Sequence, residues 1–230
     1  MPGSALITGG TGGLGAAVTR AFLDGGWRVV VPLHDEAARE RVAPHERLAL
    51  EPADLLDPAS AAGVVELAAA AADAPLRAVV NLVGGFRMGG RVHETPVEDF
   101  ESLLRLNLRP TYLVTRAALP HLQAAGGGTV VCVSSRAALA PFAGAAGYVV
   151  SKAAVLAFVD ALAVEYRDDA IRVNAILPSV IDTPANRSSM PGADHERWVA
   201  PEQVASVVRF LCEDGSAAVS GAHVPVYGRA

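Results

Sequence analysis

The chain has 230 residues, a mass of 23.7 kDa and 51% hydrophobic residues. A chain of this length can bury a substantial core, and its apolar content excludes an intrinsically disordered protein. Nineteen basic and 24 acidic residues give a net charge of −5 without a basic stripe, so we expect no nucleic-acid partner.

Short apolar runs alternate with segments of helical periodicity from one end of the chain to the other. Strands are predicted within residues 4–10, 27–33, 47–55, 76–85, 127–135, 171–179 and 221–228. Helices are predicted at residues 14–23, 59–73, 96–126, 146–167 and 200–214. Pro110 lies inside the third helical segment and is expected to kink or break it.

Strands that are apolar on both faces and separated by helices indicate a parallel sheet covered on both sides. The sequence has no internal repeat and no linker-like change in composition. We therefore predict an α/β fold, a single doubly wound Rossmann-type domain with about seven parallel strands over residues 1–230. Residues 182–201 are polar and bounded by proline, and they follow the sixth strand, where a ligand-covering loop is expected.

The sequence also predicts the cellular compartment of the protein. No uninterrupted apolar run approaches the roughly 18 residues that a membrane span needs, and the N-terminus MPGSALITGG does not resemble a signal peptide. Cys132 and Cys212 lie far apart in apolar contexts, which predicts buried thiols. We expect a cytoplasmic protein with no membrane partner. The histidines show no metal-ligand spacing, so no metal site is predicted.

The segment ITGGTGGLG joins the first strand to the first helix. Its glycines permit a tight turn and let backbone N–H groups approach a ligand closely. The start of a helix also carries free N–H groups and the positive end of the dipole, which favour a pyrophosphate. A strand, glycines and a helix at the start of a βαβ chain predict nucleotide binding, with a plain structural turn as the alternative.

The segment GYVVSK places Tyr148 and Lys152 four residues apart in a predicted helix, and therefore on the same face. A phenol ordinarily titrates near pH 10, and a nearby cation lowers its pKa. The pair is therefore a candidate acid/base. The alternative is an exposed tyrosine beside an exposed lysine.

Further motifs follow in a fixed order. The glycine loop has the pattern TGxxxGxG, Asn107 lies in LLRLNLRPTYL, and Ser135 precedes the YxxxK motif by thirteen residues. The stretch RVNAILPSVIDT comes after that motif. In this order and spacing, the motifs resemble those of the short-chain dehydrogenase/reductase family, and the resemblance covers nearly the whole chain.

The resemblance implies an NAD(P)(H)-dependent oxidoreductase that transfers a hydride between nicotinamide and a carbonyl, alcohol or C=N group. Tyr148 would be the acid/base, and Ser135 rather than Ser134 would hydrogen-bond the reacting oxygen. Lys152 would lower the pKa of the tyrosine and hold the nicotinamide ribose. Asn107 would hold a water that links Lys152 to solvent as a proton relay.

The same resemblance implies the cofactor site. Its acidic residue beside the adenine matches Asp54, and its NNAG motif is degraded to Asn81-Leu82-Val83-Gly84. In RVNAILPSVIDT, Ser179 replaces a glycine of the pattern. The implied cofactor-binding residues are Thr8, Gly9, Thr11, Gly13, Leu14, Gly15, Leu33, His34, Asp54, Leu55, Asn81, Gly84, Tyr148, Lys152, Pro178 and Thr183.

The end of the second strand bears on the choice between NADH and NADPH. NAD enzymes usually carry a carboxylate there for the ribose 2′-hydroxyl. In VVVPLHDE this position falls at Leu33 or His34, and Asp35 comes one or two residues late. Because a missing carboxylate removes repulsion of a 2′-phosphate, the sequence weakly favours NADPH.

The sequence alone does not identify the substrate. Phe142, Met190 and Trp198 are candidates for the substrate pocket. The segment from residue 177 to 202 is also similar to quinoid dihydropteridine reductases, although Ser135 suits a general carbonyl reductase. Two alternatives therefore stand beside carbonyl reduction: a dihydropteridine-reductase-like enzyme acting on a quinonoid pterin, and a non-catalytic redox sensor that binds a nucleotide. By family resemblance we expect a homodimer or homotetramer, with the helix of Tyr148 between subunits.

Overall fold

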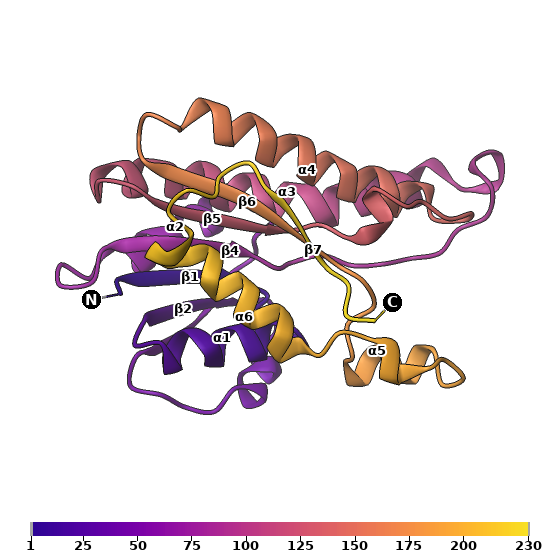
Figure 1. Ribbon diagram of the computed structural model, residues 1–230, viewed down its shortest axis with the longest axis horizontal. Coiled ribbons are helices and arrows are strands. Elements are labelled where there is room, and N and C mark those ends of the chain that lie inside the picture. The colour runs from indigo at the N-terminus through magenta and orange to yellow at the C-terminus, as the bar shows by residue number, and fades with distance from the viewer. Residues whose placement is uncertain (1, 230) are drawn as a thin grey trace.

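A seven-stranded parallel sheet runs through the molecule in the order β3-β2-β1-β4-β5-β6-β7 (Figure 1). The computed structural model describes residues 2–229. The strands are β1 (Ser4–Thr8), β2 (Arg28–Leu33), β3 (Leu48–Pro52), β4 (Leu76–Asn81), β5 (Gly128–Val133), β6 (Ile171–Pro178) and β7 (His223–Val226). The α-helices are α1 (Gly15–Asp24), α2 (Pro58–Ala69), α3 (Val97–Ala124), α4 (Ala146–Glu165), α5 (Pro184–Ser189) and α6 (Pro201–Cys212). The predicted doubly wound fold with seven parallel strands is confirmed.

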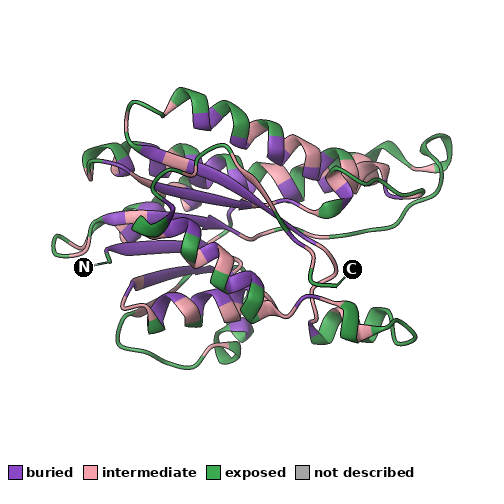
Figure 2. Cartoon of the chain, viewed as in Figure 1, coloured by how far each residue is buried: buried purple, intermediate pink, exposed green. Residues whose placement is uncertain are grey.

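Helices cover both faces of the sheet (Figure 1). The helices α2, α3 and α4 pack on one face, and their apolar side chains share a core with β-strand residues such as Leu6 and Val130. On the other face, α1 and α6 pack against residues such as Ile7 and Val131. Neighbouring strand residues therefore face opposite cores, which explains why the central strands are buried on both sides (Figure 2).

The position of the site follows from the strand order. The chain leaves β1 for β2 on one side of β1, whereas β4 pairs on its other side. Thr8 at the end of β1 is in register with Asn81 at the end of β4. In open parallel sheets, ligands bind outside the carboxyl ends of the strands at such a reversal of order. The glycine loop and the degraded NNAG motif therefore meet at this point.

The third helix differs from its prediction. Pro110 does not break it, because α3 runs without interruption from Val97 to Ala124 and contains Pro120 as well. Proline lacks the N–H for the helical bond to the carbonyl four residues earlier. The bond lost at Pro110 is the one to the carbonyl of Leu106, and α3 remains continuous without it. The helix thus remains continuous beside the candidate site.

Helix α4 is long and apolar enough to cross a membrane by length and composition alone, with a hydropathy of 1.7. In the structure it packs against α3 and β6, and 44% of the apolar window is buried. Its buried residues include Val155 and Val159, which belong to the same core as α2 and α3. The apolar composition of α4 is that of a core helix.

Candidate active site

Tyr148 and Lys152 lie one turn apart at the start of α4, as the sequence predicted. Tyr148 is half-buried, whereas Lys152 is 4% exposed and its Nζ donates to the carbonyl of Val133 at 3.1 Å. This bond ties the lysine to the carboxyl end of β5. Lys152 is also the only lysine in the sequence, since arginine supplies every other basic side chain. The pair is therefore not an exposed tyrosine beside an exposed lysine.

The two neighbouring serines after β5 have different environments. Ser134 is buried, and its hydroxyl donates to the main-chain carbonyl of Lys152 at 2.8 Å. Ser135 is half-buried, and its hydroxyl lies close enough to the Tyr148 phenol to lower the pKa of that group in part. Its Oγ also accepts from the N–H of Ala137 at 3.2 Å, which orients the hydroxyl. Ser134 fastens α4 to the sheet, and Ser135 is the serine beside the phenol.

The pKa of Tyr148 does not follow the expectation. Burial raises the pKa of the phenol above its ordinary value of 10.0, and the hydrogen bond with Ser135 offsets only part of that rise. In the protein alone the pKa of the phenol is thus raised rather than lowered, because desolvation of the phenolate is the largest cause and Lys152 is not among the groups that shift it. Near neutral pH the phenol is protonated and can donate a proton.

Lys152 shows the opposite shift. Burial lowers the pKa of its ammonium from 10.5 to about 8. The thiol of Cys132 is itself buried, and desolvation raises its pKa to about 12. At neutral pH the Lys152 ammonium is therefore charged but close to its pKa, while the Cys132 thiol and the Tyr148 phenol remain neutral.

Asn107 anchors the loop after β4. Its Oδ1 accepts from the N–H of Gly85 at 2.8 Å, and its Nδ2 donates to the carbonyl of Gly85 at 3.1 Å. Nδ2 also donates to Ser151 at 2.9 Å. Both N–H bonds of the amide are therefore used within the chain. A water could reach this side chain only through the remaining lone pair of Oδ1, a narrower role than the predicted relay.

Gly84 lies directly over two of these groups. A Cβ on Gly84 would lie 2.6 Å from Oδ1 of Asn107 and 2.9 Å from Nζ of Lys152. No other residue type fits without moving them, so the glycine of the degraded NNAG motif is required sterically. The loop after β4, α3 and α4 thus converge at this residue.

The glycine loop has the geometry of an anion cradle. The first turn of α1 follows Leu14, which provides no side-chain cap, and the N–H groups of Gly13 and Leu14 form no hydrogen bond within residues 2–229. Free N–H groups at a helix start suit a pyrophosphate. A Cβ on Gly13 would lie 2.8 Å from the methyl group of Thr183, so the two segments approach closely. These residues fit a dinucleotide.

Thr8 joins the glycine loop to the loop after β4. Its Oγ1 accepts from the N–H of Leu82 at 3.1 Å and of Val83 at 3.4 Å. Gly9 follows with a positive φ of 67°, which turns the chain away from the sheet. Thr11 is buried in the same turn. These predicted cofactor residues therefore lie together.

Other predicted cofactor residues can offer only their main chain. The side chains of Leu33, Leu55, Asn81 and Pro178 are buried, and Nδ2 of Asn81 donates to Thr115 at 3.0 Å.

Three polar residues near the predicted cofactor site are exposed instead: His34, Asp54 and Asp35. Asp54 accepts from the N–H of Leu56 at 2.9 Å, and Asp35 accepts from that of Ala37 at 3.0 Å.

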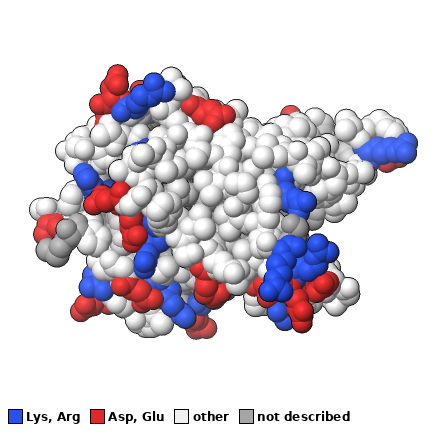
Figure 3. All heavy atoms as spheres, viewed as in Figure 1, with Lys and Arg blue, Asp and Glu red and all other residues white. Residues whose placement is uncertain are grey.

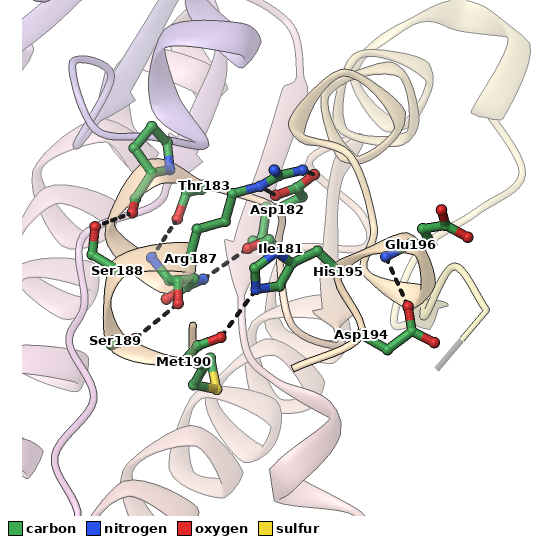
Figure 4. Close-up of polar contacts among 12 residues, drawn as sticks. Ile181, Asp182, Thr183, Arg187, Ser188, Ser189, Met190, Asp194, His195 and Glu196 are labelled. Carbon is green, nitrogen blue, oxygen red and sulfur yellow. Dashed lines mark hydrogen bonds and ion pairs between the residues drawn. The ribbon is translucent and has the colours of Figure 1, made fainter. Parts of the chain in front are cut away.

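The predicted covering loop contains a short helix, α5, which the sequence analysis missed because its polar residues lack an apolar face (Figure 4). The Thr183 side chain caps it by accepting from Asn186 at 3.2 Å, and Arg187 pairs with Asp182 at 2.7 Å. The Met190 side chain forms no hydrogen bond within residues 2–229, but its main-chain carbonyl oxygen lies 3.0 Å from Nε2 of His195. These local contacts give the segment a defined shape.

The three predicted substrate residues lie in two places. The Trp198 ring packs on His195 at 4.4 Å, inside its own segment, and Met190 is 37% exposed in the same segment. Phe142 contacts Phe86 at 6.2 Å between ring centroids, and Phe86 contacts Tyr148 edge to face at 5.0 Å. Phe86 was missed by the sequence analysis. Its only signal was an aromatic residue directly after the degraded NNAG motif.

Comparison with known proteins agrees with this geometry. A family model described as "Enoyl-(Acyl carrier protein) reductase" matches residues 9–228. The chain is 32% identical to 2-(R)-hydroxypropyl-CoM dehydrogenase of Xanthobacter autotrophicus, covering 97% of this chain and 96% of that one.

Two solved structures share the fold. One is ElxO with NADP bound, with a TM-score of 0.91 at 24% identity, covering 99% of this chain and 98% of that chain. Another is 3-ketoacyl-(acyl-carrier-protein) reductase from Brucella melitensis complexed with NADH, with a TM-score of 0.87 at 29% identity, covering 98% and 97%. The chain belongs to the short-chain dehydrogenase/reductase family and is an NAD(P)-dependent oxidoreductase.

Proposed function

We propose that the protein reduces a carbonyl group, with Tyr148 as the proton donor. The observation that carries this proposal is the placement of Ser135 beside the Tyr148 phenol, one turn before the buried Lys152. A nicotinamide cofactor supplies the hydride that adds to the carbonyl carbon. The side chains of the site then have to stabilise and protonate the carbonyl oxygen, on which negative charge develops.

Three side chains share this task. The Tyr148 phenol, protonated because burial raises its pKa, donates its proton to the oxygen. The Ser135 hydroxyl, whose Oγ already accepts from Ala137, donates a hydrogen bond to the same oxygen. The Lys152 ammonium stabilises the phenolate that remains. Asn107 holds the Gly85 loop in place over this group, and Oδ1 is its remaining contact point for a relay water.

We propose NADPH as the preferred cofactor. The end of β2 itself carries no carboxylate, since it is Leu33 followed by His34, and the carboxylate of Asp35 accepts from Ala37 as the cap of the following 3₁₀ helix η1 (Glu36–Arg41). His34 is exposed at this position. The His34→Asp variant should shift preference toward NADH, because the new carboxylate would accept from the ribose 2′-hydroxyl and repel a 2′-phosphate. The ratio of kcat/KM for the two cofactors measures this.

The function is tested by oxidation of NADPH and NADH with a panel of ketones and aldehydes, and with freshly generated quinonoid dihydropterin. We expect turnover of members of the carbonyl panel. Rapid turnover of the pterin alone would instead favour the dihydropteridine-reductase-like activity. If neither substrate class is reduced with either cofactor, carbonyl reduction is wrong.

We also propose a homo-oligomer that forms through α3 and α4, in the cytoplasm. Five large apolar side chains on these helices are more than a third exposed: Val97, Leu106, Tyr112, Val150 and Val164. Light scattering should give a multiple of 23.7 kDa. The Tyr112→Glu/Val164→Glu double variant should give a smaller species, because buried carboxylates are costly, whereas Val92→Glu outside this face should not. A monomeric wild type would contradict this proposal.

A further inference from the structure

Two phenylalanines stand beside the candidate proton donor. Phe86 meets the Tyr148 ring edge to face at an interplanar angle of 86°, and Phe142 meets Phe86 at 49°. Phe86 is 56% exposed and Phe142 47% exposed. Two large rings that are only half covered and lie next to a reacting group offer an apolar surface to a ligand.

Hydrogen bonds of neighbouring glycines fix the main-chain segments that carry both rings. Gly85, which precedes Phe86, forms two hydrogen bonds with Asn107, at 2.8 and 3.1 Å. Gly89 donates to the carbonyl of Gly144 at 2.7 Å and so joins the segment of Phe86 to that of Phe142. Gly144 has a positive φ of 76°, and a Cβ there would lie 2.8 Å from the Gly89 carbonyl. The two main-chain segments that carry Phe86 and Phe142 are therefore fixed by hydrogen bonds to Asn107 and to each other.

The two arginines nearest to the rings in the sequence each contact another side chain. Arg87 forms an ion pair with Asp99 at 2.7 Å. Arg136, which follows Ser135, lies over the ring of Tyr227 at 5.2 Å. In Figure 3 the lobe at the upper right, which carries the loop before α3, is mostly free of charged atoms except near its end. To bind a carboxylate or phosphate of the substrate, Arg87 would have to leave its ion pair with Asp99, and Arg136 its contact with the Tyr227 ring.

We infer that the substrate is a neutral carbonyl compound with an aromatic group, and that Phe86 and Phe142 select it by packing on that group. The inference rests on the proposed carbonyl reduction. The aromatic group packs on the two phenylalanines while the carbonyl oxygen lies between Tyr148 and Ser135. Removing either ring takes away contact with the aromatic group but leaves the reacting groups in place.

Three α-keto probes separate the features of this substrate. Methyl benzoylformate is neutral and aromatic, benzoylformate is the corresponding aromatic carboxylate, and methyl pyruvate is neutral without a ring. We expect the wild type to reduce methyl benzoylformate with a kcat/KM at least about tenfold above that of either of the others. Phe86→Ala and Phe142→Ala should each lower this value by about tenfold, mainly through KM, and change that of methyl pyruvate less than about threefold.

The matched control is Phe210→Ala, since Phe210 is 47% exposed on α6, like Phe142. It should leave all three probes unchanged. Phe86→Leu, which keeps an apolar side chain, provides a second variant if Phe86→Ala folds poorly. Equal turnover of methyl benzoylformate and benzoylformate by the wild type would overturn the inference. So would equal losses for all three probes in the phenylalanine variants.

A binding readout separates failure of this inference from failure of carbonyl reduction. If the wild type reduces no probe, the proposed function fails, and binding of acetophenone to the cofactor-loaded protein is then followed by saturation-transfer NMR. Binding that is lost in Phe86→Ala but kept in Phe210→Ala would support the aromatic surface. No binding by the wild type would overturn it.

Discussion

The Tyr148→Phe variant should lose about 10²–10⁴-fold in kcat, because a positioned general acid contributes that much. Phenylalanine keeps the ring that Phe86 contacts edge to face at 5.0 Å and removes only the hydroxyl. The fold and the glycine loop should therefore be unaffected. Single-turnover kinetics with NADPH and a reactive ketone would measure the chemical step directly.

Cofactor affinity provides the control for this variant. Fluorescence titration with NADPH should give a Kd within about threefold of wild type, because the pyrophosphate cradle around Gly13 and Leu14 lies outside α4. Ser135→Ala should have a smaller effect on kcat, since it removes a hydrogen bond rather than the proton donor. Full activity in Tyr148→Phe would show that the proposed mechanism is wrong.

The Lys152→Met variant should be more stable than wild type and much less active. A fall in the lysine pKa from 10.5 to about 8 corresponds to about 3 kcal/mol of cost for keeping the buried ammonium charged at pH 7. Methionine avoids this cost but loses the bond to the Val133 carbonyl, worth about 1 kcal/mol. We therefore expect a gain of about 2 kcal/mol in unfolding free energy and a loss of about 10²-fold in kcat.

The pH dependence of stability distinguishes this cause from a general improvement in packing. Between pH 8 and 10.5 the unfolded chain binds the lysine proton more tightly than the folded protein, so wild-type stability rises with pH relative to Lys152→Met. Denaturant unfolding at pH 7 and pH 9.5 should show the difference between the two proteins shrinking. A difference independent of pH would contradict the buried-charge explanation.

Activity and spectroscopy test the same group. Because Lys152 is the only lysine in the chain, lysine labelled with ¹⁵N at Nζ should give one side-chain NMR signal, and its titration should be centred at about pH 8. The kcat/KM of wild type should fall above that pH, as the ammonium loses its charge. A lysine that titrates near 10.5 would show that it is not desolvated as the structure implies.

Much of the fold could be predicted from the sequence, because it depends on local patterns. Apolar runs such as WRVVVPL predict strands through their composition, and the glycine loop predicts its own turn through conformational freedom. The spacing of Tyr148 and Lys152 predicts a shared helix face because an α-helix has a fixed period. Helix α5 escaped prediction because a short polar helix has no such pattern. Pro110 does not interrupt α3, because packing of the helix overrides the lost hydrogen bond.

The chemistry-bearing residue types and their order were thus determined by the sequence alone, whereas their environments were decided by the tertiary structure. Burial raises the pKa of Tyr148 and lowers that of Lys152, and burial depends on segments far apart in the chain. The contact of Phe86 with Tyr148 likewise joins the loop after β4 to α4. Desolvation and ring packing depend on distances in space, which sequence spacing does not give across separate elements.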